Sequence, residues 1–262
     1  MFFEPKTRAE EQKLAARINS SHVQAVSSSY EFIFDAFPIN FGKELSKKER
    51  SAKKLYASSL IYGEIDFDTF GMAIQKIIDI YGKPGVGTSG EEGKLQKRGG
   101  MFFDLGSGVG KAVIAAALVH NFDVCTGIEI LEELHKGAED VRTVYETKAK
   151  HELDRAFDTV VDMRCGDMLD LSFKNWTYGD VVFMNSTCFD DELMLKLAHL
   201  AVGMRKGTFV ITTTQKLPSP DFEICEYEMH EMSWGTATIY IQQKTTDARE
   251  YDSDDYDSEN DL

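Results

Sequence analysis

Short apolar runs alternate with longer segments of helical spacing between residues 101 and 214. The apolar runs predict buried strands at 101–105, 123–129, 159–164, 180–185 and 208–214. Helical spacing predicts helices at 109–120, 131–150 and 190–203, with a weaker connection at 169–178. Strands that alternate with helices in this way form a parallel sheet with both faces covered. The hydrophobic pattern therefore predicts an α/β fold.

The segments on either side of this region have different patterns. Before it, residues 6–36 carry apolar side chains on one helical face until Pro38, and a second helical run occupies residues 70–82. After it, the apolar stretches at 221–229 and 237–244 have no helix-length segment between them, so we expect these two strands to pair antiparallel. The whole pattern predicts a Rossmann-like sheet of seven strands with an N-terminal, mostly helical extension.

Composition and charge divide the chain of 262 residues further. We predict a helical extension over residues 1–60, an α/β domain over 61–244 and a disordered acidic tail over 245–262. The formal net charge is −15, and residues 247–262 alone contribute eight acidic residues and one arginine. A charge of this sign argues against tight binding of nucleic acid by the chain as a whole. Two basic segments, 43–54 and 94–98, stand inside this acidic protein.

The cysteine, histidine and hydropathy patterns exclude several classes of protein. The histidines show no ligand spacing, so no metal site is predicted. The charged N-terminus and the absence of a run of ~18 apolar residues predict neither a signal peptide nor a membrane span. Four well-separated cysteines in apolar surroundings predict buried thiols of a reducing compartment rather than disulfides: Cys125, Cys165, Cys188 and Cys225.

A glycine-rich loop follows the first predicted strand, in the order Asp104, Gly106, Gly108 and Gly110. An open parallel sheet binds ligands at the carboxyl ends of its strands, and glycines let a ligand approach the backbone. A dinucleotide site prefers G-x-G-x-x-G and an anionic pyrophosphate. Here Asp104 would repel a phosphate and would attract a cationic group.

Two further carboxylates follow the next two strands. Glu129 ends the second strand and suits two hydrogen bonds to a ribose diol, while Asp167 follows the third and suits an adenine amino group. Ribose, adenine and a cationic amino acid are the parts of S-adenosylmethionine. The predicted cofactor is therefore S-adenosylmethionine; a nicotinamide nucleotide and a sheet that binds no ligand are the alternatives.

At these residues the chain resembles a known family. The segments IYGEIDFD (61–68), FDLGSGVG (103–110), DVVFMNSTCF (180–189) and SWGTATIYI (233–241) are together similar to the non-SET histone-lysine methyltransferases of the disruptor of telomeric silencing type. The resemblance covers residues 28–244. Its more specific mark is the Tyr-Gly-Glu upstream of the glycine loop, which general methyltransferases lack. The resemblance implies the sheet of a class I S-adenosylmethionine-dependent methyltransferase.

The resemblance also implies roles for individual residues. Tyr62 and Glu64 are expected to fold over the methionine end of the cofactor. The other implied cofactor contacts are Asp104, Gly106 and Gly108 at the methionine end, Glu129 at the ribose, and Asp167 and Met168 at the adenine. Asn185 is expected beside the transferred methyl group and the incoming lysine. The implied walls of the lysine channel are Phe189, Trp234 and Tyr240, with the register of the tyrosine open by one or two positions.

The implied reaction suits these residue types. A free lysine is protonated near neutral pH because its pKa is about 10.4, and an apolar, aromatic channel lowers that pKa. Positioning and desolvation then supply most of the catalysis, and no strong general base is predicted. The resemblance thus implies a chromatin regulator that methylates a lysine of histone H3 in nucleosomes. We expect it to be monomeric and nuclear, with a cytoplasmic location as the alternative.

Three residues depart from the family pattern. Ser186 stands where the family usually has a second asparagine, Ile65 where it has a hydroxyl residue, and Met168 where it has an aromatic residue beside adenine. Two alternatives therefore stay open: a lysine methyltransferase that acts on a non-histone protein, and a catalytically inactive cofactor-binding module. Segments 43–54 and 94–98 are expected either to contact DNA weakly or to be solvated surface.

Overall fold

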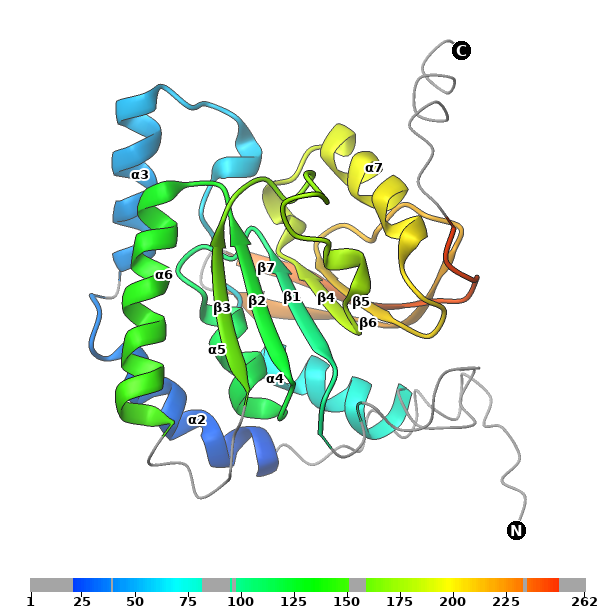
Figure 1. Ribbon diagram of the computed structural model, residues 1–262, viewed down its shortest axis with the longest axis horizontal. Helices are drawn as coiled ribbons and strands as arrows, with labels where there is room; N and C mark the ends of the chain where they lie inside the picture. The colour runs from blue at the N-terminus through cyan, green and yellow to red at the C-terminus, as the bar shows by residue number, and fades with distance from the viewer. Residues whose placement is uncertain are drawn as a thin grey trace.

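A mixed sheet of seven strands forms the centre of the molecule in a computed structural model that describes residues 21–38, 40–81, 95, 98–150, 159–232 and 235–249 (Figure 1). The strand order is β3-β2-β1-β4-β5-β7-β6. The strands are β1 (Met101–Leu105), β2 (Val124–Glu129), β3 (Val160–Cys165), β4 (Val181–Met184), β5 (Phe209–Thr213), β6 (Phe222–Met232) and β7 (Gly235–Lys244). Strands β1 to β5 run parallel, and β7 pairs antiparallel with both β5 and β6. The predicted Rossmann-like α/β fold is confirmed.

Five of the six described α-helices coincide with or overlap the predicted runs, apart from turns of other types at their ends, whereas α3 lies in a segment for which no helical run was predicted. The α-helices are α2 (Ser21–Phe34), α3 (Phe41–Lys53), α4 (Phe67–Lys76), α5 (Lys111–Val119), α6 (Glu132–Val144) and α7 (Asp191–Leu200). Single π turns continue α4 and α6, as η2 (Ile77–Tyr81) and η3 (Tyr145–Ala149). Short 3₁₀ helices are η1 (Ser58–Leu60), η4 (Trp176–Tyr178), η5 (Ser186–Cys188) and η6 (Ala201–Gly203). The part of the first predicted helix before Ser21 lies outside the described residues.

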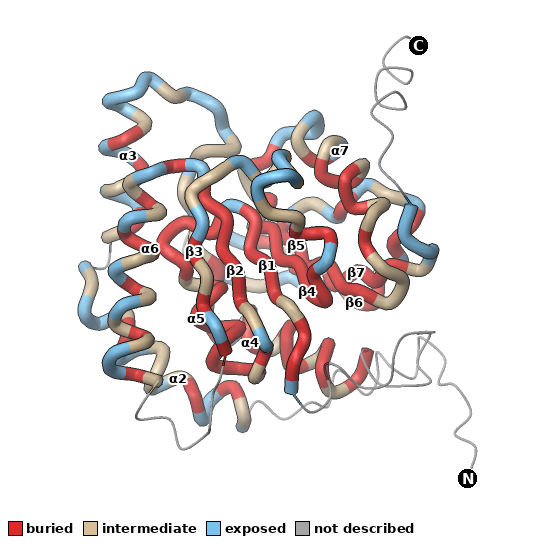
Figure 2. Tube along the Cα trace, in the orientation of Figure 1, coloured by how far each residue is buried: buried red, intermediate tan, exposed pale blue. Residues whose placement is uncertain are grey.

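Alternate residues of the parallel strands point to two hydrophobic layers. Phe102, on β1, belongs to the layer that packs against α2, α4, α5 and α6, and its neighbour Phe103 belongs to the layer that packs against α7. Because both faces are covered, the strands β1, β4 and β5 are buried along nearly their whole length (Figure 2). This burial explains why their apolar runs were recognisable in the sequence.

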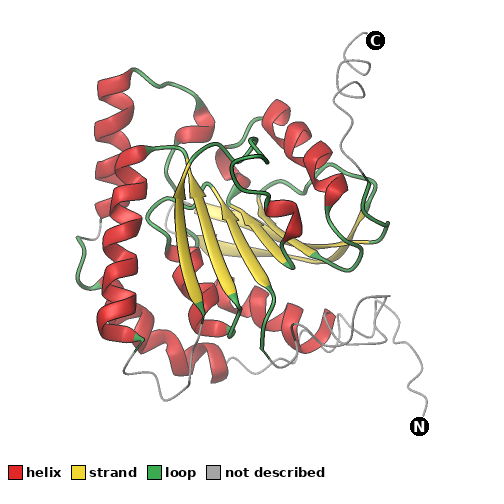
Figure 3. Ribbon diagram, viewed as in Figure 1, coloured by secondary structure: helices red, strands yellow, loops and turns green. Residues whose placement is uncertain are grey.

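In the described part of the N-terminal extension, helices α2 and α3 pack on the α/β domain (Figure 3). Helix α2 contacts α4 and α5, and its Val23, Val26 and Ile33 belong to the main hydrophobic core. Helix α3, which contains the basic segment 43–54 except for its C-cap residue Lys54, packs against α6. A Cβ on Gly137 of α6 would lie 2.7 Å from Leu45 Cδ1, so the two helices approach closely there.

The C-terminal described residues contact the end of the sheet. Lys244 Nζ is fully buried and lies 3.1 Å from Asp221 Oδ2, and Arg249 pairs with the same carboxylate. These contacts hold residues 245–249, the first part of the predicted tail, against the domain. Residues 250–262 lie outside the described part of the chain. Among the described helices, none is long and apolar enough to cross a membrane.

Candidate functional site

A cavity of about 300 Å³ opens at the carboxyl ends of the parallel strands. Its walls come from the segment before α4, the glycine loop, the β2–α6 turn and the residues that follow β3 and β4. The lining residues are Lys43, Ser59, Leu60, Ile61, Tyr62, Gly63, Gly106, Ile128, Glu129, Ile130, Leu131, Leu134, Gly166, Asp167, Met168, Asn185, Thr187, Cys188, Phe189 and Leu193. The cavity therefore lies where parallel sheets of this kind bind ligands.

Seven residues that the sequence singled out meet around this cavity. They are Tyr62, Gly106, Glu129, Asp167, Met168, Asn185 and Phe189. Three others, Glu64, Asp104 and Gly108, do not line it, although each adjoins a residue or loop that does. Tyr240 lies on β7 and is also absent from the lining, and Trp234 lies outside the described residues.

Glu129 ties the glycine loop to the turn that begins α6. Its Oε2 accepts a hydrogen bond from the Gly108 amide at 2.8 Å, and its Oε1 accepts one from the Leu131 amide at 2.8 Å. The residue is 6% exposed, so burial raises its pKa, and these amides oppose that effect. A carboxylate oxygen can accept further hydrogen bonds, so Glu129 keeps acceptor capacity toward a ligand in the cavity.

Asp104 is a buried carboxylate on β1, two residues before Gly106 of the glycine loop. It is 3% exposed, and burial together with the nearby Glu129 raises its pKa well above the ordinary value. No cation among the described residues pairs with it. A cationic ligand group near this carboxylate would favour its ionised form.

The Tyr62 ring is clamped between two glycines. A Cβ on Gly42 of α3, or on Gly108 of the glycine loop, would overlap this ring. The Tyr62 hydroxyl donates to Glu64 Oε1 at 2.7 Å, and Lys111 Nζ lies 2.5 Å from Glu64 Oε2. The Tyr-Gly-Glu segment is thereby fixed over the glycine loop, and its role at the methionine end of the cofactor stays a prediction. Glu64 and Lys111 themselves line a second cavity, beside Tyr30 and Phe34.

Asn185 joins the Tyr-Gly-Glu segment to the sheet. Its Nδ2 donates to the Gly63 carbonyl at 3.0 Å, and its Oδ1 accepts from Thr213 Oγ1 at 2.7 Å and from Thr187 Oγ1 at 3.3 Å. These bonds run from the end of β4 to the end of β5 and across to the segment before α4. The side-chain amide is therefore held in one orientation at the edge of the cavity.

The wall near Asn185 and the wall near Asp167 differ in character. Phe189 is 7% exposed and its ring lies near Gly106, where an added Cβ would be 3.7 Å from Phe189 Cζ. On the other side Asp167 is exposed, and its Oδ1 accepts from the Leu169 amide at 2.9 Å. The Met168 carbonyl accepts from Trp176 Nε1 at 2.8 Å, which fixes this loop on the α7 side of the sheet.

Tyr240 and two of the three departures do not line the cavity. The Tyr240 ring stacks on Tyr227 with centroids 5.9 Å apart, and Tyr240 pairs with Thr212 across β5 and β7. Ser186 is fully buried and donates to the Thr213 carbonyl at 2.6 Å. Ile65 belongs to the main core. Ser186 and Ile65 are thus buried residues that stabilise the fold, whereas Met168 lines the cavity.

Lys111 is a site residue that the sequence analysis missed. A cation at the first residue of a helix is disfavoured by the helix dipole, so its position directly after Gly110 was the available signal. Its ion pair with Glu64 explains why it is tolerated there. Within the described part of the chain, no group of three or more His, Cys, Asp or Glu residues is placed to hold a metal ion.

Several solved structures are similar to this chain. TrmN from Thermus thermophilus is 13% identical with a TM-score of 0.49, over 75% of this chain and 53% of that chain. An O-methyltransferase from Bacillus cereus in complex with SAH is 15% identical with a TM-score of 0.45, over 85% and 99% of the two chains. A putative RNA methyltransferase from Pyrococcus horikoshii is 15% identical with a TM-score of 0.43, over 79% and 98%. The chain spans about half the length of TrmN.

The family assignment rests on a sequence match and not on these distant structural similarities. Among curated proteins, none matches this chain. The family model described as "Histone methylation protein DOT1" matches residues 90–245, which is more than half of the chain and includes the glycine loop, Glu129, Asp167 and Asn185. This chain therefore belongs to the DOT1 histone methylation family.

Proposed function

We propose that this protein is an S-adenosylmethionine-dependent lysine methyltransferase that acts on histone H3 in nucleosomes. The observation that carries the proposal is one cavity, at the carboxyl ends of the parallel strands, that is lined by Tyr62, Glu129, Asp167 and Asn185. Membership of the DOT1 histone methylation family supports the substrate class.

The residues around the cavity suit S-adenosylmethionine. Gly106 lines it with a φ of +81°, a conformation that favours glycine, and the absence of a Cβ leaves the backbone open to a ligand. Glu129 would hold the ribose hydroxyls, and Asp167 with Met168 would hold the adenine. Asp104, buried without a cationic partner among the described residues, would meet the cationic methionine end. An anionic phosphate in this place would be repelled by both Asp104 and Glu129.

The chain's own contribution to transfer is positioning and exclusion of water. When bound, the cofactor supplies a methyl group on a sulfonium centre. An incoming lysine must lose its proton before its nitrogen attacks, and a site beside the buried Phe189 ring and Leu193 disfavours the ammonium form. Asn185, held by Gly63 and Thr213, fixes the edge of the cavity against which that amine would be aligned.

Helix α3 offers a surface for nucleosomal DNA close to this cavity. Lys43 lines the cavity itself, and Lys47 and Lys54 are exposed and form no ion pair with another described residue. Lys48 and Lys53 instead pair with Glu133 and Glu49. The proposed DNA contact of segment 43–54 therefore rests on Lys43, Lys47 and Lys54. Most of segment 94–98 lies outside the described residues.

The test is methyl transfer from labelled S-adenosylmethionine to nucleosomes, free histone octamers and a whole-cell extract, with the modified residue located by mass spectrometry. The proposal expects a methylated lysine on histone H3 of nucleosomes. A dominant labelled band that is not a histone would favour the non-histone alternative, which the acidic net charge of −15 motivates. Cofactor binding without transfer to any of these substrates would favour the inactive module.

A further inference from the structure

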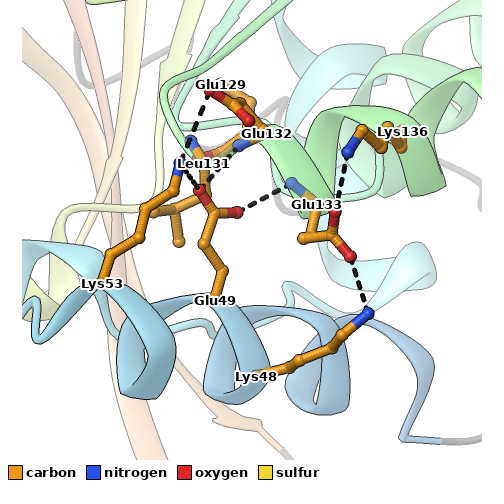
Figure 4. Close-up of polar contacts among 8 residues, drawn as sticks. All are labelled: Lys48, Glu49, Lys53, Glu129, Leu131, Glu132, Glu133 and Lys136. Carbon is orange, nitrogen blue, oxygen red and sulfur yellow. Dashed lines mark hydrogen bonds and ion pairs between the residues drawn. The ribbon is translucent and has the colours of Figure 1, made fainter.

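Helix α6 begins without a cap of its own. The residue before its first turn is Leu131, whose side chain accepts no hydrogen bond, so the first backbone amides of the helix need an acceptor from elsewhere. Glu49, on α3, supplies it: its Oε1 accepts from the Glu132 amide at 3.2 Å and its Oε2 from the Glu133 amide at 2.7 Å (Figure 4). A carboxylate from a distant segment thus caps α6.

The Glu49 carboxylate is buried and ionised. Its side chain is 3% exposed, and Lys53 Nζ lies 2.7 Å from Oε1. Burial alone would raise the pKa of Glu49, but the hydrogen bonds from Lys53 and from the Glu133 and Glu132 amides outweigh it and lower the pKa. A negative charge at the N-terminus of α6 also interacts favourably with the helix dipole.

The contacts of α3 place Glu49 at this end of α6. Phe41 and Leu45 lie against Gly137, and Glu49, one turn beyond Leu45, reaches Glu133, one turn before Gly137. Phe41 and Leu45 also pack on the small hydrophobic cluster of Val109, Leu131 and Leu134. The capping contact is therefore the end of a continuous α3–α6 interface.

The first turn of α6, which Glu49 caps, is separated by two residues from Glu129, the carboxylate that is proposed to bind the ribose. Leu131 donates its amide to Glu129 Oε1 at 2.8 Å and lines the cavity together with Ile130. The next two amides, of Glu132 and Glu133, are those held by Glu49. The amides of Leu131, Glu132 and Glu133 belong to one short turn. Loss of the bonds from Glu132 and Glu133 to Glu49 would therefore also shift the Leu131 amide.

We propose that Glu49 is a positioning residue for the cofactor site: by capping α6 from α3 it fixes the Glu129–Leu131 turn in the geometry that binds the cofactor's ribose. This role rests on the proposed function, and it goes beyond it because Glu49 does not line the cavity. It also makes cofactor affinity depend on the docking of the N-terminal basic helix.

The test measures binding of S-adenosylhomocysteine by calorimetry, together with hydrogen exchange of the backbone amides at residues 130–134. Glu49→Ala should raise the Kd about tenfold and speed exchange in that turn more than elsewhere. Glu49→Gln keeps one oxygen acceptor and should show a smaller rise. Glu44→Ala, an exposed carboxylate in the first turn of the same helix, is the matched control and should bind like the wild type.

The outcomes separate this role from the function on which it rests. A folded Glu49→Ala protein that binds S-adenosylhomocysteine as tightly as the wild type would overturn the positioning role alone. Wild-type protein that binds none would overturn the proposed function and the role with it. If the alanine variant fails to fold, Glu49→Gln decides, and an unchanged Kd in that variant would overturn the role.

Discussion

At the scale of single residues, Asn185 should matter more for turnover than for cofactor affinity. Asn185→Ala removes the bonds to Gly63 and Thr213 and so frees the segment above the cavity. Misplacement of this kind can cost about 10²-fold in kcat. Steady-state kinetics should show a large fall in kcat with a small change in the KM of the cofactor. Thr213→Val, which removes one of the three hydrogen bonds of the Asn185 side chain, should lose less; an unchanged kcat in Asn185→Ala would contradict the assignment.

Glu129 holds two backbone amides and is also proposed to bind the ribose, so its removal should weaken cofactor binding strongly. Glu129→Ala should weaken cofactor binding by about 1.5–3 kcal/mol, the range for hydrogen bonds to a charged group. It also releases the amides of Gly108 and Leu131. Glu129→Gln keeps an acceptor for one amide and should retain part of the affinity. Calorimetric titration with S-adenosylhomocysteine measures both; equal affinity in the alanine variant would exclude Glu129 as a ligand of the ribose.

Asp104 should make both stability and cofactor binding depend on pH. Burial and the Glu129 carboxylate raise its pKa well above the ordinary 3.8. Between that value and the raised one, the folded protein keeps a proton that the unfolded chain has released, so the stability of the cofactor-free protein falls as pH rises through this range. A bound cationic group lowers the pKa again, so binding should release protons and tighten as pH rises.

Calorimetry of cofactor binding in buffers of different ionisation enthalpy measures this proton release. Asp104→Asn, which cannot ionise, should abolish most of it. Proton release that is absent in the wild type, or equal in the wild type and Asp104→Asn, would contradict a cationic ligand group beside Asp104.

At the scale of elements, the clamp on Tyr62 links α3 to the glycine loop. Gly42→Ala places a methyl group in the Tyr62 ring, although alanine is intrinsically the better helix former. The variant should therefore bind S-adenosylhomocysteine several-fold more weakly without the gain in unfolding free energy that helix propensity alone predicts. The double variant Gly42→Ala, Tyr62→Ala should bind no more weakly than Tyr62→Ala alone. Wild-type affinity in Gly42→Ala would show that the ring position is unimportant.

The strands were predictable from sequence, whereas helix α3 was not recognised. Strands such as β1 and β4 are buried on both faces, so each appears as a continuous apolar run. In α3 the face toward α6 includes Phe41 and Leu45 but also the buried, charged Glu49, which breaks the hydrophobic period. Its basic charge was therefore the only feature of this segment that the sequence analysis recognised. Its packing depends on partners 80 or more residues away in sequence, such as Glu132 and Glu133.

Within the site, too, some residues could be predicted from the local sequence pattern, whereas others depend on contacts with residues far away in the sequence. Glu129 and Asp167 stand where strands end, so topology alone brought them to one edge of the sheet. The bond from Asn185 to Gly63 joins residues 122 apart and has no counterpart in a local pattern. The register of Tyr240 was open because it depends on pairing, and β6 contains an irregularity between Ile224 and Glu226.

At the scale of the whole molecule, an acidic protein is proposed to meet DNA through one basic helix. Replacing Lys47 with Gln and Lys54 with Asn, which tolerates the left-handed backbone at position 54, should weaken nucleosome binding. The slope of log affinity against log salt concentration should fall by about 2. Lys148→Gln, an exposed lysine on η3, should change neither. An unchanged slope in the double variant would identify segment 43–54 as solvated surface.

The most direct test of the account is a crystal structure of the protein with S-adenosylhomocysteine. The account predicts the ligand in the cavity between Tyr62 and Phe189, with its ribose hydroxyls on Glu129, its adenine beside Asp167 and Met168, and its sulfur toward Asn185. An empty cavity after soaking at saturating ligand, or a phosphate-bearing nucleotide seated on the glycine loop instead, would contradict it.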